Sequence, residues 1–370
     1  MSFRPLVALK SKMGELKAIC HTTSDHQGTS PRIVVELLDS VAPADGAQLF
    51  PALVEAAAHM VMMGRPLWVD THALSGNAAL ARRPGGPFEF LDQSVEARLV
   101  TEFGLMTSLQ VPDVPPLIPV VPDCATDNEL GLVASLREHR ERDVVVRFRA
   151  LNAPVSDLHQ RLRRVARLVR TRPDDMHAVI DLGFVETVPP AAVRQAVSVA
   201  RMLVDQLGPE STTLLAGSVP ATRNGFVTTA RDRPEVALWL AVAEELDGAI
   251  QYGDYGVTHP APPASGTSMA RSPNPYLYYT IPGSTIVFRR QPTKVDGKTP
   301  SGAAAEAFAD LAEELVSRPE FAGGDYSWGD QELAQCRRGG RRTAGSVSQW
   351  LSMATSHHLS HLARRTPNNL

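Results

Sequence analysis

Residues 143–182 read DVVVRFRALNAPVSDLHQRLRRVARLVRTRPDDMHAVIDL and contain one complete strand–helix–strand unit. The β-branched run at 143–149 and the apolar run at 177–182 are typical of buried strands. Between them, residues 155–171 carry apolar side chains every three or four positions, opposite a row of arginines, which predicts an amphipathic helix. Two strands joined by a helical crossover run parallel, so this unit predicts an α/β fold.

The same unit recurs along the chain. Short apolar runs predict eight strands, at 4–9, 32–38, 66–71, 117–121, 143–149, 177–182, 212–217 and 249–254. The segments between them predict helices, at 13–20, 47–63, 90–108, 127–141, 155–171, 189–207 and 233–246. Eight such units is the number that closes a (β/α)8 TIM-type barrel. An open doubly wound sheet is the alternative, although neither GxGxxG nor a P-loop sequence follows any of the strands.

The pattern changes after the eighth strand. Residues 257–275 are rich in Pro, Ser and Gly and predict a loop, and 276–290 predict a β-hairpin around Pro282-Gly283. The helix expected at 302–317 would then be the eighth barrel helix, delayed by the inserted hairpin. We therefore expect a barrel over residues 1–320 and a C-terminal helical extension, residues 321–370, packed on it.

The composition is that of an ordinary globular protein, with 43% hydrophobic and 21% charged residues and a net charge of −3. This balance gives no general case for binding nucleic acid or an anionic membrane. The three cysteines, Cys20, Cys124 and Cys336, lie far apart and form no CxxC pair. They favour reduced thiols, so a cytoplasmic location is expected.

The alternation of side chains along the strands predicts a charged ring inside the barrel mouth. In 143–149 the apolar residues Val144, Val146 and Phe148 must face the helices, which turns Arg147 and Arg149 inward. The same reasoning, applied at the carboxyl ends of the other strands, where barrel active sites lie, selects Lys10, Glu36, Asp70, His72, Asp181 and Asp254, with Ser218 after the seventh strand. The alternative to a functional ring is that these residues are polar only because the strands end where they reach solvent.

Such a ring suits an anionic small molecule, because guanidinium groups grip phosphate and carboxylate groups through paired hydrogen bonds. The candidates for substrate binding are Lys10, Lys12, Arg147, Arg149 and Ser218. The candidates for general acid–base catalysis are Glu36, Asp70, His72, Asp181 and Asp254. A hydrolase or lyase acting on a phosphate-bearing compound is the leading expectation. Alternatively, Glu36, Asp70 and Asp181 hold Mg²⁺ through their oxygens; no HExxH or clustered Cys and His residues indicate zinc.

Two basic segments leave a nucleic-acid contact open as a weaker alternative. The helix at 155–171 carries five arginines, Arg161, Arg163, Arg164, Arg167 and Arg170. The run CRRGGRR at 336–342 is of a kind that is usually a solvated loop, with a phosphate or nucleic-acid contact as the less common role.

Both ends of the chain resemble the phage-type beta protein family. The resemblance is carried by RPLVALKSKMGELKAI at 4–19, GDYSWGDQELAQC at 324–336, GSVSQW at 345–350 and SHHL at 356–359. It marks Lys10, Lys12, Glu15, Trp328, Asp330, Trp350 and His358 as family-pattern positions. The family brings no established catalytic residues, and it implies a link to phage–host conflict. A non-catalytic binding or sensing protein in phage defence is therefore the alternative function. A tail folded over the mouth would add Trp328 and Asp330 to the substrate-binding residues, near Lys10.

Overall fold

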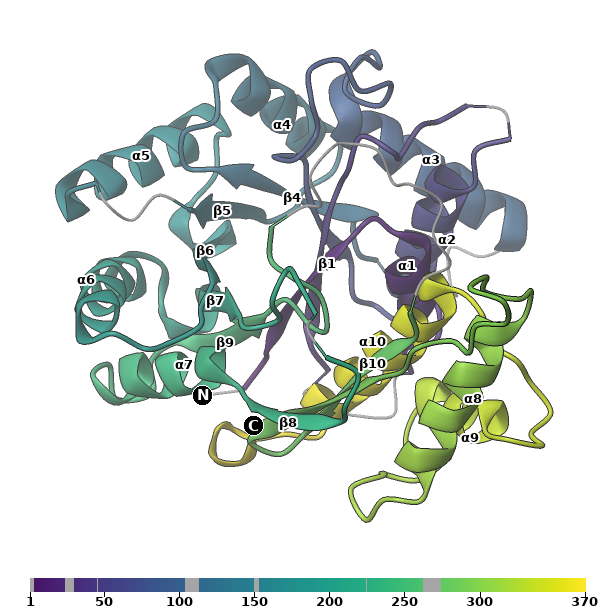
Figure 1. Cartoon of the computed structure of the whole chain (residues 1–370). Helices are drawn as coiled ribbons and strands as arrows, with labels where there is room; N and C mark the ends of the chain where they lie inside the picture. The colour runs from purple at the N-terminus through teal and green to yellow at the C-terminus, as the bar shows by residue number, and fades with distance from the viewer. Residues whose placement is uncertain are drawn as a thin grey trace.

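The computed structural model describes residues 3–23, 30–44, 46–103, 113–149, 153–223, 225–261 and 274–370. Its centre is a closed barrel of parallel strands, in which β9 pairs with both β7 and β1 (Figure 1). The strands are β1 (Leu6–Lys10), β2 (Arg32–Glu36), β3 (Leu67–Asp70), β4 (Leu117–Pro122), β5 (Val144–Phe148), β6 (Met176–Phe184), β7 (Thr212–Gly217) and β9 (Gln251–Asp254). All eight predicted strands are present, and the predicted (β/α)8 barrel is confirmed.

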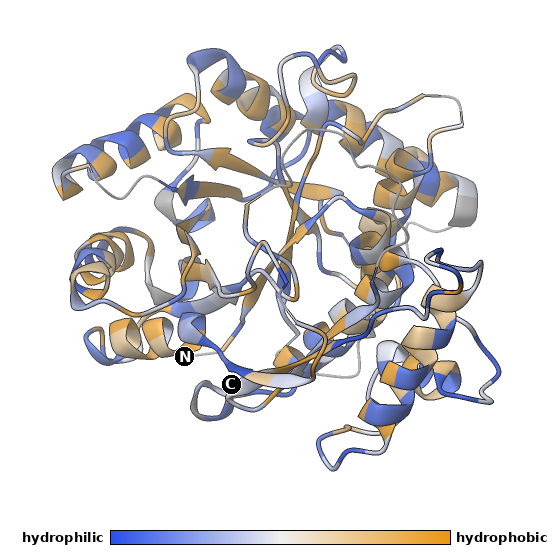
Figure 2. Ribbon diagram, in the orientation of Figure 1, coloured by the Kyte–Doolittle hydropathy of each residue, from blue (hydrophilic) through white to orange (hydrophobic). Residues whose placement is uncertain are grey.

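Helices surround the barrel and follow the strands in order. They are α1 (Met13–Ile19), α2 (Leu49–Met62), α3 (Gly86–Phe103), α4 (Asp127–His139), α5 (Val155–Leu168), α6 (Pro190–Leu207) and α7 (Pro234–Glu244), with short 3-10 turns at Pro173–Asp175, Pro209–Ser211 and Pro367–Asn369. The predicted helix end at 104–108 lies outside the described residues. Figure 2 shows mostly apolar strands and helices striped with polar and apolar residues, as expected where only one helix face meets the barrel.

The strand alternation separates two apolar layers. Val144, Val146 and Phe148 of β5 belong to the large core between strands and helices. Val145 belongs to a smaller cluster that fills the barrel interior. The interior is therefore packed with side chains over most of its depth, and its charged network lies at the carboxyl end.

The predicted hairpin at 276–290 is present as β10 (Tyr276–Ile281) and β11 (Ser284–Arg289). β11 also pairs with a strand that the sequence pattern did not indicate, β8 (Thr229–Asp232), which precedes α7. These strands form a separate antiparallel sheet beside the barrel. Residues of β8 are exposed throughout, so this strand lacked the apolar pattern by which strands are recognised.

The eighth helix of the barrel is α10 (Val347–Ala363), which packs beside α1. The prediction that residues 302–317 supply it is wrong, because α8 (Ala303–Val316) packs instead with α9 (Trp328–Cys336), outside the ring (Figure 1). α10 joins two cores: Leu359 and Leu362 pack in the barrel core, whereas Trp350 packs against Phe308 in a second core with α8 and the antiparallel sheet.

Candidate functional site at the barrel mouth

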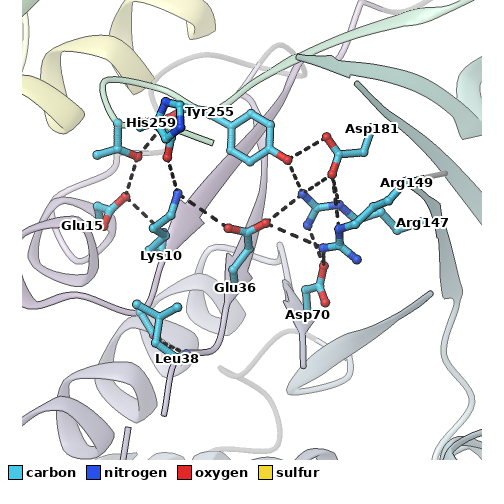
Figure 3. A network of polar contacts seen from close by, with 12 residues as sticks. Lys10, Glu15, Glu36, Leu38, Asp70, Arg147, Arg149, Asp181, Tyr255 and His259 are labelled. Carbon is cyan, nitrogen blue, oxygen red and sulfur yellow. Dashed lines mark hydrogen bonds and ion pairs between the residues drawn. The ribbon is translucent and has the colours of Figure 1, made fainter. Parts of the chain in front are cut away.

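Arg147 lies at the centre of a polar network inside the carboxyl end of the barrel (Figure 3). Its Nη1 is 2.6 Å from an oxygen of Asp70. Its Nη2 is 2.9 Å from Asp181, 2.8 Å from Glu36, and donates to the Tyr255 hydroxyl at 2.6 Å. The side chain is only 1% exposed. Three carboxylates from three different strands therefore converge on one buried guanidinium.

Arg149 extends this network toward solvent. Its Nη2 is 2.6 Å from Asp70, and its Nε is 3.4 Å from Asp181. The side chain is 26% exposed, the largest exposure among the arginines and carboxylates of the network. Its Nη1 is buried and has no hydrogen-bond partner among the described residues. A buried unpaired donor costs about 1–3 kcal/mol, so this nitrogen is a place where a ligand oxygen would be stabilised.

Lys10 connects the ring to α1 and to the loop after β9. Its Nζ donates to the carbonyl of His259 at 2.7 Å and lies 3.7 Å from Glu36. Glu15, fully buried at the start of α1, accepts a hydrogen bond from the backbone N–H of Lys10 at 3.1 Å. Burial lowers the pKa of Lys10 and raises the pKa of Glu15. Burial therefore disfavours the charged forms of both groups at this edge of the mouth.

The opposite charges at the centre of the ring stabilise one another's ionised forms. Burial alone would raise the pKa of Asp70, but the charges of Arg147 and Arg149 outweigh it, and the pKa is lowered. Burial likewise opposes the charge of Arg147, yet the carboxylates beside it raise its pKa further above the ordinary value. Both groups are therefore fully ionised at neutral pH.

A short segment, residues 255–260, closes the ring from above, and we call it the strap. Tyr255 turns into the barrel and donates to Asp181 at 2.7 Å. Thr258 donates to Glu15 at 3.4 Å, and the ring of His259 lies against Phe184. Sequence reasoning missed Tyr255 because it follows the last residue of β9, where no alternation indicates its direction.

Asp254 does not belong to the ring, so the prediction that placed it at the mouth is wrong. It shares the outward side of β9 with Tyr252, whose hydroxyl donates to it at 2.8 Å. His358 of α10 lies 3.0 Å from one oxygen of Asp254, and Arg233 lies 3.2 Å from the other. This carboxylate joins β9 to α10 and to the start of α7, between barrel and helices.

The remaining mouth candidates are less enclosed. His72 follows β3, has an exposed side chain, and its backbone N–H donates to Asp70 at 2.9 Å. Lys12 is half-buried at the N-terminus of α1, near Lys10 and Glu15. Ser218 directly follows β7 and is half-buried.

The tail does not cover the mouth, which corrects the predicted position of Trp328 and Asp330. Trp328 stacks on His21 at 4.0 Å, with the exposed Lys17 5.1 Å from its ring, on the outer side of α1. Asp330 is fully buried under α10, 2.9 Å from Nδ1 of His357, and accepts a hydrogen bond from Tyr279 at 2.8 Å. Neither side chain contacts Lys10 among the described interactions.

The family model for the Beta protein family matches residues 4–364, which is nearly the whole chain. The chain belongs to the Beta protein family. No curated protein matches its sequence. Five of the positions by which the chain resembles the Beta protein family fall into two groups in the structure. Lys10 and Glu15 join the mouth network, whereas Asp330, Trp350 and His358 are buried where α10 meets α9, the antiparallel sheet and β9.

In this member of the Beta protein family, the predicted magnesium ligands are engaged by arginines. Glu36, Asp70 and Asp181 each lie within 3 Å of a guanidinium nitrogen of Arg147. A divalent cation between them would have to displace that side chain. Within the described ranges, no three His, Cys, Asp or Glu side chains are grouped so as to hold a metal ion. The carboxylates present therefore do not fit a magnesium site in this arrangement. None of the described helices is both long and apolar enough to cross a membrane.

The buried ion pairs of Asp254 make the free energy of unfolding depend on pH in the acid range. Burial would raise its pKa, but His358 and Arg233 lower it from 3.8 to about 2. A carboxyl whose pKa is lower in the folded than in the unfolded protein stabilises the fold fully when the pH lies above its unfolded-state pKa. This stabilisation is lost as the pH falls toward its folded-state pKa. We expect Asp254 to contribute about 2 kcal/mol near neutral pH, lost between about pH 5 and pH 2.

Urea unfolding of the wild type and of Asp254→Asn across this range measures the effect. The difference in unfolding free energy between the two proteins should shrink steadily as the pH falls. The exposed Asp232→Asn serves as the control and should track the wild type. A difference that stays constant from neutral to acid pH would contradict the assignment.

Proposed function

We propose that the barrel mouth binds the phosphate or carboxylate group of a small molecule through Arg149. The observation that carries the proposal is the buried, unpartnered Nη1 of this partly exposed guanidinium. Asp70 and Asp181 hold the other nitrogens of Arg149, so the free donor is oriented before any ligand arrives. Burial raises the pKa of Glu15, which disfavours a negative charge on this carboxyl at the edge of the mouth.

We further propose that the bound compound undergoes a hydrolase or lyase reaction with His72 as the proton-transferring group. Burial, and then the charge of Arg149, lower the pKa of His72, so its imidazole is neutral and able to accept a proton near pH 7. Glu36 and Asp181 hold the arginines in place, because each of them is ion-paired to Arg147. In this proposal they are positioning residues, and only His72 and Arg149 touch the substrate.

Inorganic phosphate is the simplest probe of the proposed site. At a concentration about a hundredfold above its dissociation constant, phosphate should raise the melting temperature by ~5 °C, because a ligand that binds only the folded state stabilises it. Arg149→Gln should remove this shift. Arg172→Gln, which removes a 72% exposed arginine paired with Asp175, is the matched control and should keep it. An equal phosphate shift in all three proteins would refute a site at Arg149.

A non-catalytic binding or sensing role is the second candidate, and the burial of the ring favours it. Lys10 and Arg147 are each only 1% exposed, and the strap covers them. The family resemblance extends this role to phage–host conflict, and the three free thiols are compatible with a cytoplasmic location. A panel of phosphate esters separates the two candidates: release of phosphate that depends on Arg149 supports the enzyme, and binding without turnover supports the sensor.

A further inference from the structure

A cationic groove lies on the outer side of α1, away from the barrel mouth. Its cavity of about 360 Å³ is lined by side chains from α1, α9, α10 and the loop before α10. Among them are Lys17, Trp328, Arg341, Arg342 and Gln349. A second hollow of about 480 Å³ adjoins it, lined by Arg337, Arg338 and, again, Arg341. We call the two hollows together the arginine groove; Figure 1 shows α9 beside α10, outside the barrel ring.

The loop at 337–342 is shaped by its two glycines so that it presents arginines on both sides. Gly339 has a φ of +70°, a conformation that strains other residues. A Cβ on Gly340 would lie 2.1 Å from the carbonyl oxygen of Gln335. The backbone N–H of Arg342 donates to that same carbonyl at 3.1 Å, which closes the turn. Arg341 therefore stands between the two hollows on a fixed turn.

The groove has an excess of positive charge, although the chain carries a net charge of −3. Arg342 is paired with Glu332 at 2.7 Å, and Arg338 is paired with Asp310. Glu313 also lines the second hollow. Among the described residues, the exposed side chains of Lys17, Arg337 and Arg341 have no carboxylate partner. These three cations remain available to an anion in solution.

The cations stand beside an aromatic side chain that lines the same cavity. Trp328 is fixed by its stacking on His21 at 4.0 Å, and it is half-buried. A basic groove that also offers an aromatic surface is the arrangement by which proteins bind single strands, since phosphates meet the cations and bases lie against the ring. Two adjoining hollows that share Arg341 suit a chain of phosphates better than a single phosphate group.

We propose that the arginine groove binds single-stranded nucleic acid, with successive phosphates at Arg337, Arg341 and Lys17 and a base against Trp328. The helix α5 is the weaker surface for this role. Two of its four arginines are paired with carboxylates, Arg161 with Asp123 and Arg164 with Asp127, and Arg170 just beyond its end is paired with Glu138. The arginine groove is separate from the barrel mouth, so this proposal does not depend on the function proposed for the mouth.

Fluorescence anisotropy with a labelled oligothymidylate of about ten nucleotides tests the proposal. The full-length protein should bind it in low salt and lose affinity as salt rises from about 50 to 200 mM. The double variant Arg337→Gln/Arg341→Gln should weaken binding at least tenfold and reduce the slope of log K against log salt by about 1.4, since each phosphate contact to a single strand contributes about 0.7. Arg163→Gln/Arg167→Gln removes two exposed arginines of α5 and should change neither quantity.

Variants of Trp328 and Arg149 provide a further test and a control for the binding experiment. Trp328→Leu should weaken binding about fivefold or more, and Trp328→Phe should restore most of it because a ring is kept. Arg149→Gln should leave oligonucleotide binding unchanged. The proposal is overturned if no binding occurs at low salt, if the α5 variant rather than the groove variant loses it, or if thymidine monophosphate competes as well as the oligonucleotide at equal phosphate concentration.

Discussion

Arg147→Met is expected to lose about 3–5 kcal/mol of unfolding free energy, the cost of breaking a buried ion pair by removing one partner. The substitution keeps an extended apolar side chain but leaves Glu36, Asp70 and Asp181 facing one another without the central guanidinium. Arg149 reaches Asp70 and Asp181, so part of the negative charge stays compensated. Urea unfolding of the purified variant measures the loss, and the fraction of soluble protein reports it if the variant does not fold.

Arg149→Met is the matched control for this prediction. It removes a guanidinium that directly follows β5 and contacts the same carboxylates, but the side chain is 26% exposed. Water can replace part of the lost contacts, so a loss of about 1 kcal/mol is expected. Arg147→Lys, which keeps the charge but loses the paired geometry, should fall between the two. Equal stability of Arg147→Met and Arg149→Met would contradict the central place given to Arg147.

Asp330→Ala is the second substitution expected to have a large effect, again about 3–5 kcal/mol. The carboxylate is fully buried and holds three elements together: Ser327 at the start of α9, Tyr279 of β10 and His357 of α10. Nε2 of His357 lies 2.7 Å from the carbonyl of Thr280, so both of its ring nitrogens face acceptors. Removing the carboxylate leaves Nδ1 of this buried imidazole without the partner that it has in the wild type.

Asp325→Ala provides the comparison, because Asp325 is exposed and lies five residues earlier in the same segment. Its removal should change the unfolding free energy by less than about 0.5 kcal/mol. Thermal melting of both variants beside the wild type distinguishes the two positions. Similar melting temperatures for Asp330→Ala and the wild type would show that α9 and α10 are held together by apolar packing alone.

The alternation of side chains explains why most of the mouth could be predicted from sequence. In β2, β3, β5 and β6 a charged residue interrupts an apolar run, and the apolar neighbours leave it only the inward direction. This reasoning placed Glu36, Asp70, Arg147 and Asp181 correctly, and the structure brings all four together. It worked because the outward face of a barrel strand packs against helices and must be apolar, so a one-residue shift would turn the charged side chains into that apolar layer.

The prediction placed Asp254 at the mouth because the residue lies at the carboxyl end of a strand, although the alternation of side chains along that strand points it outward. It has the same parity as Ile250 and Tyr252, which pack outward, and its partners are His358 and Arg233. His358 is 104 positions away in the sequence. Local periodicity carries no information about such a partner. The same limit explains the eighth helix, since the pattern of 302–317 predicts a helix but does not say which surface it covers.

A crystal structure of the protein grown in phosphate tests the account of the mouth most directly. We predict a phosphate oxygen within hydrogen-bond distance of Nη1 of Arg149, with the pairs from Arg149 to Asp70 and Asp181 retained. Phosphate bound only at Arg341 in the arginine groove, with the mouth closed and Nη1 of Arg149 still unpaired, would contradict it.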